Sequence, residues 1–148
     1  MKKIILLDSN KFSKNFLRKT KLFLRLIVIA KFFFRDPAKK KIVIYDCVGA
    51  WALEFLLAGY NFSVISTRAH KIKEIYISKR IIFYILNNLF KRSLKQNYLA
   101  SLIKAIDPKL VITQIDNSLD FYITAKTLKK DIKFIALQGG HRTSPLDE

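Results

Sequence analysis

The chain has 148 residues, of which 51% are apolar, and its 28 Lys and Arg against 11 Asp and Glu give a formal net charge of +17. This apolar content excludes a disordered basic tail, because such a chain could not bury enough surface to offset its conformational entropy. A single Cys excludes a disulfide framework, and two distant His residues, His70 and His141, argue against a metal centre.

The positive charge suggests nucleic acid as a partner, but the composition argues against it. Lys outnumbers Arg 21 to 7, whereas recognition of bases and phosphates favours the bidentate Arg guanidinium. The charge is also uneven, since residues 1–40 carry 12 basic and 2 acidic groups (+10) and residues 41–148 carry 16 and 9 (+7). We therefore expect no nucleic-acid partner.

The first forty residues are predicted to form a basic amphipathic leader helix and a linker. The apolar run after Lys3 ends at Asp8 without a cleavage site, which argues against a signal peptide. Between residues 11 and 34, basic side chains recur every three or four positions and share one side of a helix. These basic residues are Lys11, Lys14, Arg18, Lys21 and Arg25.

This helix has two interpretations. Its apolar part is too short to span a bilayer, which takes about 20 apolar residues. As an interfacial helix, residues 11–34 would lie on an anionic membrane surface. The alternative is a helix that packs on the following domain and leaves its basic side in solvent. Because Asp36-Pro37 disfavours further helix, the boundary to a domain of residues 41–148 is placed at residue 40.

Residues 41–148 alternate between predicted strands and helices. The run Ile42–Tyr45 is apolar without alternation, as in a strand covered on both faces. Further strands are predicted at 62–66, 74–78, 110–115 and 133–137, and helices at 50–57, 81–90, 96–106 and 119–128. Such alternation indicates right-handed crossovers. The predicted fold class is α/β, a Rossmann-like, mostly parallel sheet with flanking helices, preceded by the N-terminal helix.

Polar residues and glycines directly follow four of these strands. In open α/β sheets, ligands bind beyond the carboxyl ends of the strands. The candidate substrate-binding residues are therefore Asp46, Arg68, Asp116, Asn117, Gln138, Gly139, Gly140 and Arg142. Structural roles compete with this one, since Asp46 and Asp116-Asn117 can cap helices and Arg68 can lie in a solvated basic loop.

The loop from Gln138 to Arg142 contains the residues best suited to ligand binding and proton transfer. Its two glycines let the backbone approach a ligand closely. His141 can accept or donate a proton near neutral pH, and Arg142 can hold a phosphate or carboxylate with two hydrogen bonds. The competing interpretation is an ordinary Gly-Gly turn followed by a solvated His and Arg.

Several ligand-binding motifs are absent. The segment D-C-V-G-A-W has one Gly where a dinucleotide fingerprint needs three, and no phosphate-binding G-x-x-x-x-G-K-[ST] occurs. There is also no G-x-S-x-G nucleophile elbow and no helix-turn-helix or aromatic RNA-binding signature. We expect no metal and no cofactor bound by this domain.

A family resemblance rests on the Lys-rich leader and on the segments K-K-K-I-V-I-Y-D, P-K-L-V-I-T-Q-I-D-N and F-I-A-L-Q-G-G-H-R. Together they resemble the bacterial surface carbohydrate biosynthesis proteins. That family looks like GT-B-type glycosyltransferases, in which two Rossmann-like domains face each other over a cleft. The resemblance covers residues 30–145 and corresponds to the N-terminal, acceptor-side domain. Gly139 departs from the family pattern, which has Asn there.

The resemblance implies the acceptor-side part of a membrane-associated glycosyltransferase for bacterial surface polysaccharide. His141 would be the general base and Arg142 would position an anionic acceptor or phosphate. The implied partner is a carbohydrate or lipid-linked acceptor. The implied location is cytoplasmic, peripheral to the inner face of the plasma membrane.

A GT-B enzyme binds its nucleotide-sugar donor in a second domain, for which 148 residues leave no room. We expect either a fragment that is inactive alone or a subunit that pairs with a separate donor-domain subunit. Two other functions stay open. One is a non-catalytic Rossmann-like module that docks on a membrane or a partner protein, and the less favoured one is a basic nucleic-acid-binding protein.

Overall fold

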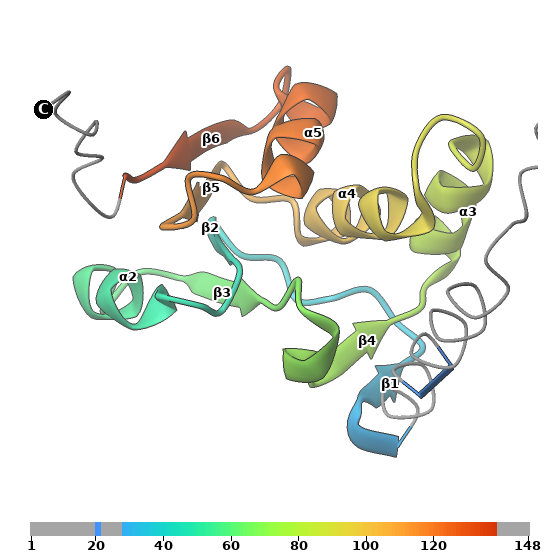
Figure 1. The fold of residues 1–148 in the computed structure, drawn as a ribbon, viewed down its shortest axis with the longest axis horizontal. Helices are drawn as coiled ribbons and strands as arrows, with labels where there is room; N and C mark the ends of the chain where they lie inside the picture. The colour runs from blue at the N-terminus through green and yellow to red at the C-terminus, as the bar shows by residue number, and fades with distance from the viewer. Residues whose placement is uncertain (1–19, 22–27, 139–148) are drawn as a thin grey trace, which may run out of the picture.

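The computed structural model describes residues 20–21 and 28–138. In chain order the elements are β1 (Lys31–Phe33), β2 (Ile42–Tyr45), α2 (Ala50–Leu56), β3 (Phe62–Ile65), the 3₁₀ turn η1 (Ala69–Lys71), β4 (Glu74–Tyr76), α3 (Lys79–Asn87), α4 (Leu94–Ile106), β5 (Leu110–Thr113), α5 (Leu119–Leu128) and β6 (Lys133–Ala136) (Figure 1).

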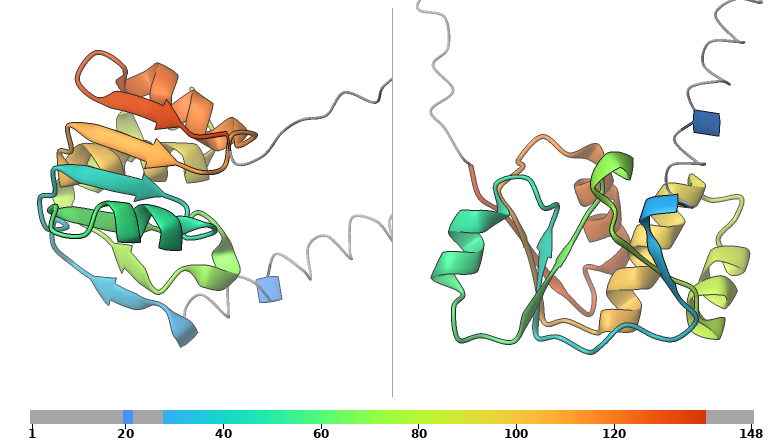
Figure 2. Two further views of the ribbon diagram at one scale, coloured as in Figure 1. Left: turned by 90° about the vertical axis from the view of Figure 1, so that its left-hand side faces the viewer. Right: turned by 90° about the horizontal axis from the view of Figure 1, so that it is seen from below.

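Four of these strands form one parallel sheet in the order β3-β2-β5-β6. Ile44 in β2 is in register with Val64 on one side and with Ile112 on the other. Helix α2 covers one face of the sheet, and α4 and α5 cover the other (Figure 2). This arrangement confirms the predicted Rossmann-like α/β class.

Side chains of the central strands alternate between two apolar cores, which explains why β2 is apolar throughout. Tyr45 belongs to the larger core, which α4 and α5 complete, whereas Ile44 packs with Leu53 of α2 in the smaller one. Phe121 of α5 joins the larger core. Its ring makes edge-on contacts with Tyr45 at 5.2 Å and with Phe134 at 5.7 Å between centroids.

The helix predicted over residues 11–34 is wrong at its C-terminal end, where β1 is a strand. This strand pairs in parallel with β4 in a separate two-stranded sheet. The Lys31 N–H donates to the Lys73 carbonyl at 2.8 Å, and the Phe33 ring stacks on Tyr76 at 5.0 Å. Aromatic residues favour strands, and the pairing satisfies backbone groups that either strand alone would leave open. The folded unit thus extends N-terminal to the boundary expected at residue 40.

Little else of the predicted leader helix is described. Thr20, Lys21, Val28 and Ile29 are helical, and the other positions before β1 lie outside the described residues except Ala30, which is in a bend. Within the described part of the chain, no helix combines the length and the apolar character needed to cross a bilayer. The interfacial role of residues 11–34 stays a prediction.

Two helices begin earlier than predicted because serines cap them. Ser78 accepts a hydrogen bond from the Ile81 N–H at 3.3 Å, so α3 starts at residue 79 rather than 81. Ser93 and Gln96 form a capping box in which each side chain accepts from the other residue's backbone N–H. Helix α4 therefore starts at residue 94 rather than 96.

Truncation of Phe121 should destabilise the protein far more than truncation of an exposed Phe. Phe121 is 2% exposed and Phe90 is 99% exposed. We expect Phe121→Ala to lower the free energy of unfolding by about 3 to 5 kcal/mol and Phe90→Ala to change it by less than about 0.5 kcal/mol. Urea unfolding followed by circular dichroism measures both, and equal losses would contradict the core described above.

Candidate functional site at the carboxyl edge of the sheet

The order of the strands places a switch in chain direction between β2 and β5, and in open α/β sheets ligands bind beyond the carboxyl ends of the strands at such a switch. After β2 the chain moves to β3 on one side, whereas β5 and β6 lie on the other side. The loops that follow β2 and β5 therefore lead away from each other at the carboxyl edge. All four sheet strands are parallel, so residues 46–49, 66–68, 114–118 and 137–138 leave the sheet at this same edge.

A buried threonine joins the ends of β2 and β5. Thr113 is fully buried, and its hydroxyl donates to the Tyr45 carbonyl at 2.8 Å and accepts from the Ile115 N–H at 3.1 Å. The two bonds connect neighbouring strands and turn the chain out of β5. Thr113 is not among the site residues predicted from the sequence, although a hydroxyl at the end of an apolar strand is a signal for it.

Asp46 holds the ends of β2 and β3 together. Its backbone adopts a left-handed conformation with φ 74°, and its side chain is almost fully buried. One carboxylate oxygen accepts from the Val48 N–H at 3.2 Å. The other accepts from the Thr67 hydroxyl at 2.9 Å and from Arg68 Nε at 3.2 Å. This network gives the carboxylate a structural role at the site and no role as a helix cap.

The same contacts set the protonation state of Asp46. Burial opposes its ionisation, but the hydrogen bonds from Thr67, Arg68 and Val48 together outweigh burial and lower the pKa below the ordinary value of 3.8. A carboxylate with a lowered pKa is ionised at neutral pH and is a weak proton acceptor. Asp46 therefore suits hydrogen bonding and positioning better than general-base chemistry.

Gly49 lets the loop after β2 approach the end of β5. Its φ is +73°, and a Cβ placed there would lie 2.7 Å from Gln114 Oε1. Both the backbone conformation and the close neighbour favour glycine at this position. Gln114 was not among the predicted site residues, and the structure adds its amide to this edge.

The structure also shows whether Asp116 and Asn117, in the loop after β5, cap the helix that follows. Ser118, and neither Asp116 nor Asn117, is the N-cap of α5, because its side chain accepts from the Phe121 N–H at 3.3 Å. Asn117 is exposed, Asp116 is half-buried, and the Asp116 carbonyl accepts from the Tyr122 hydroxyl at 2.7 Å. The capping interpretation of Asp116-Asn117 is therefore wrong, and the exposed Asn117 amide can meet a ligand.

The remaining predicted site residues divide into two groups. Arg68 is 46% exposed, and within the described part of the chain it contacts Asp46 through its Nε. Its terminal nitrogens can therefore meet an anion. Gln138 follows β6 and is exposed. Gly139, Gly140, His141 and Arg142 lie outside the described residues, so the proposed base and the second candidate anion ligand are not placed.

No metal site is formed by the described residues. Among them, no group of three or more His, Cys, Asp or Glu side chains could hold an ion. Cys47, next to Asp46 in the loop after β2, is half-buried and its thiol is free of any disulfide. The arrangement at the carboxyl edge can donate hydrogen bonds and attract an anion through Arg68.

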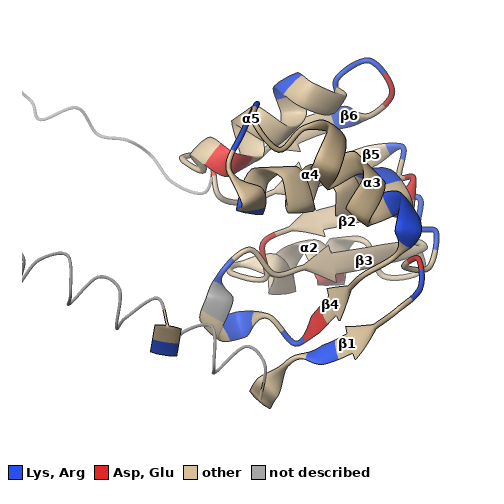
Figure 3. Cartoon of the chain, turned by 90° about the vertical axis from the view of Figure 1, so that its right-hand side faces the viewer, with Lys and Arg blue, Asp and Glu red and all other residues tan. Residues whose placement is uncertain are grey.

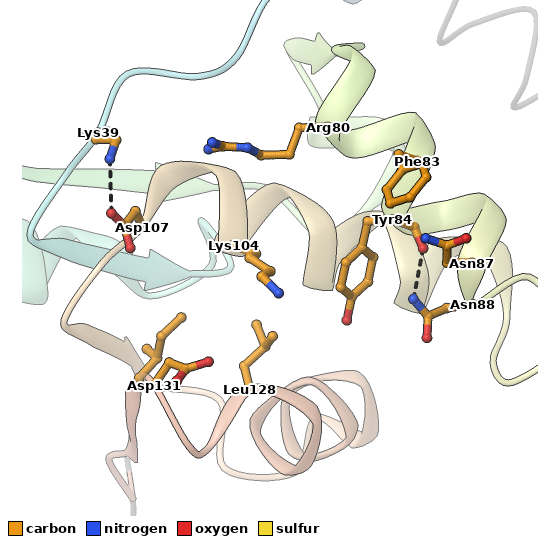
Figure 4. A pocket seen from close by; sticks show the side chains of 11 residues that line it. Lys39, Arg80, Phe83, Tyr84, Asn87, Asn88, Lys104, Asp107, Leu128 and Asp131 are labelled. Carbon is orange, nitrogen blue, oxygen red and sulfur yellow. Dashed lines mark hydrogen bonds and ion pairs between the residues drawn. The ribbon is translucent and has the colours of Figure 1, made fainter.

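A pocket of about 560 Å³ lies elsewhere, beside the amino ends of β2, β5 and β6 (Figure 4). Its cationic side chains already have partners: Lys39 contacts Asp107 at 3.1 Å, Lys104 lies 5.6 Å from the Tyr84 ring centroid, and Arg80 lies 3.9 Å from Asp36. Asp131 also lines the pocket, so three carboxylates, those of Asp36, Asp107 and Asp131, lie in or beside it and offset the charge of its three cations. None of the residues that line this pocket is among the site residues predicted from the sequence.

Comparisons with models of protein families, with curated proteins and with solved structures found no match. The resemblance to the surface carbohydrate biosynthesis proteins therefore stays a prediction from the sequence segments.

Removal of the Thr113 hydroxyl should weaken the junction of β2 and β5. Thr113→Val keeps the shape but removes two buried hydrogen bonds, and we expect a loss of about 1 to 3 kcal/mol in unfolding free energy. Thr127→Val is the matched control, because that hydroxyl bonds only the Ile123 carbonyl of its own helix and should matter by less than about 0.5 kcal/mol. Equal urea midpoints for the two variants would contradict the role of Thr113.

The Asp46 charge should stabilise the protein in a pH-dependent way. Asp46→Asn keeps a residue that tolerates the left-handed backbone, and we expect it to cost about 1 to 2 kcal/mol at neutral pH. Because the folded pKa lies below 3.8, this stabilisation is complete above that pH and disappears as the pH falls through the folded pKa. Urea midpoints of both proteins should converge on acidification, and a difference independent of pH would refute the charge effect.

Proposed function

We propose that this chain is the acceptor-side part of a membrane-associated glycosyltransferase for bacterial surface polysaccharide. The observation that carries the proposal is the carboxyl edge of the sheet. There the loops after β2, β3, β5 and β6 present Gly49, Arg68, Asn117 and Gln138. This is the ligand-binding edge of open α/β sheets, and the segments of the family resemblance end in three of these loops.

The exposed groups at this edge suit a hydroxylated and partly anionic acceptor. The Asn117 and Gln138 amides can both donate and accept hydrogen bonds, as sugar hydroxyls require. Arg68 adds positive charge for a phosphate group of a lipid-linked acceptor. Asp46 supports Arg68 by fixing its Nε at 3.2 Å.

In the reaction, an acceptor hydroxyl oxygen attacks the anomeric carbon of the sugar and the bond to the nucleoside diphosphate breaks. His141, the candidate base predicted from the sequence, would take the hydroxyl proton, and Arg142 would hold an anionic acceptor or phosphate. The nucleotide-sugar donor would bind in a second domain or a separate donor-domain subunit. Residues 11–34 would attach the enzyme to the cytoplasmic face of an anionic membrane.

A non-catalytic binding module is the second candidate. One observation favours it: the single acidic side chain of the loop after β2, Asp46, is buried in hydrogen bonds to Thr67, Arg68 and Val48. A module that docks on a partner needs such a rigid loop but no free carboxylate. Under this alternative the carboxyl edge would bind no sugar.

Ligand titration followed by ¹⁵N NMR separates the two functions. The probes are octyl glycosides below their micelle concentration, geranyl phosphate and UDP-glucose. We expect the octyl glycosides and geranyl phosphate to shift the amide signals of residues 46–49, 66–68, 114–118 and 138, and UDP-glucose to leave them unchanged. Shifts confined to the pocket near Lys104, or no shifts with any probe, would contradict the proposal.

A matched pair of variants sharpens this test. Asn117→Ala removes an exposed amide at the carboxyl edge and should weaken binding about three- to tenfold, as loss of one hydrogen bond predicts. Asn87→Ala removes an exposed amide on α3 and should leave binding unchanged. Equal effects of the two substitutions would place the ligand elsewhere.

A further inference from the structure

Helix α3 has apolar side chains on two sides. On its inner side Ile81 is 1% exposed, and Tyr84 and Ile85 pack against the core with α4. On its outer side, and in the turn that follows it, lie five exposed apolar residues: Ile82, Phe83, Leu86, Leu89 and Phe90. We call these five residues, with Lys79 and Lys91 at either end, the α3 surface.

The exposed residues form a patch on α3 and the turn after it. Ile82 and Phe83 precede Leu86 by four and three residues, so these side chains share one side of the helix, and Leu89 and Phe90 lie in the turn directly after α3. Phe83 is 68% exposed, Leu86 is 61% exposed and Phe90 is 99% exposed. A surface helix normally has polar residues on its outer side, and an exposed apolar patch of this kind marks a site of interaction.

The charged residues on α3 and in the turn after it are all basic. From Ile75 to Ile106 the sequence contains no Asp or Glu and six basic residues: Lys79, Arg80, Lys91, Arg92, Lys95 and Lys104. Figure 3 shows Lys and Arg at the start of α3 and no acidic residue on it. Arg80 and Lys95 contact Asp36 and Asp120, whereas Lys79 and Lys91 have no ion-pair partner among the described residues.

This combination determines the kind of partner. A second copy of the chain would bring another basic surface toward this one, and the net charge of +17 opposes such an approach. An anionic lipid surface instead accepts the apolar side chains in its acyl region and attracts Lys79 and Lys91, whose long stems reach back to the headgroups. We propose that the α3 surface docks on anionic lipid bilayers.

The proposal is independent of glycosyl transfer and of the leader segment. The α3 surface belongs to the folded domain, because α3 packs on α4 and Ser78 caps it. Docking through this surface would therefore orient the folded domain on the bilayer. Helix α2 lies at the far side of the molecule from α3 (Figure 1) and should stay in water.

The single tryptophan of the chain, Trp51 on α2, makes a site-specific test possible. The full chain and the double variant Trp51→Phe, Phe90→Trp each contain one indole. With vesicles of phosphatidylglycerol and brominated phosphatidylcholine, the indole introduced by Phe90→Trp should shift to shorter emission wavelength and be quenched. Trp51 of the unmodified chain, which is 78% exposed, should not respond. Quenching of Trp51, or none of the introduced indole, would overturn the proposal.

Vesicle co-sedimentation provides the second measurement. We expect the triple variant Phe83→Ser, Leu86→Ser, Phe90→Ser to bind phosphatidylglycerol vesicles about tenfold or more weakly than the unmodified chain, since each apolar side chain adds to membrane affinity. The control Trp51→Ser, Phe55→Ser removes exposed apolar groups from α2 and should bind like the unmodified chain. Circular dichroism verifies that both variants fold. Undiminished binding of the triple variant, or no binding of the unmodified chain, would overturn the proposal.

Discussion

The pairing of β2 with β5 is the interaction on which the rest of the structure depends. These two strands lie at the centre of the sheet, and Val43 and Val111 in their middle are fully inaccessible to solvent. Thr113 and Tyr45, joined by a hydrogen bond, are 68 residues apart in the sequence. The contact thus brings the two halves of the domain together, and β3 and β6 flank this central pair.

The same pairing explains why polar groups gather at the carboxyl edge of the sheet. Because β2 and β5 are neighbours while their following loops diverge, polar groups from distant parts of the chain gather there. Some of these groups bond to one another and stabilise the edge, such as Asp46, which accepts hydrogen bonds from Thr67 and Arg68. Others, such as Asn117 and Gln138, stay exposed. Rigid support beneath exposed polar groups is the arrangement that a binding site requires.

The basic residues of the folded domain are also unevenly distributed. The net charge of residues 41–148 is smaller than that of residues 1–40, but much of its positive part lies in the acid-free stretch from Ile75 to Ile106. This stretch contains α3, whose outer side is apolar. The hydrophobic and basic groups therefore coincide in one place of the folded domain, where composition alone suggested only a general excess of Lys.

The sequence by itself determined the elements of the domain and the loops at its carboxyl edge. An uninterrupted apolar run such as Ile42–Tyr45 indicates a strand that is buried on both faces, and this can be recognised from neighbouring residues in the sequence alone. Tertiary structure alone decided the partners. It made β1 a strand by pairing it with β4, it placed β2 beside β5, and it connected Asp46 to residues 21 and 22 positions away. The physical reason is that a local pattern of residues specifies which side chains and backbone groups must be buried or hydrogen-bonded. The residues that bury them or bond to them come from distant parts of the sequence, and only the folded chain brings these together.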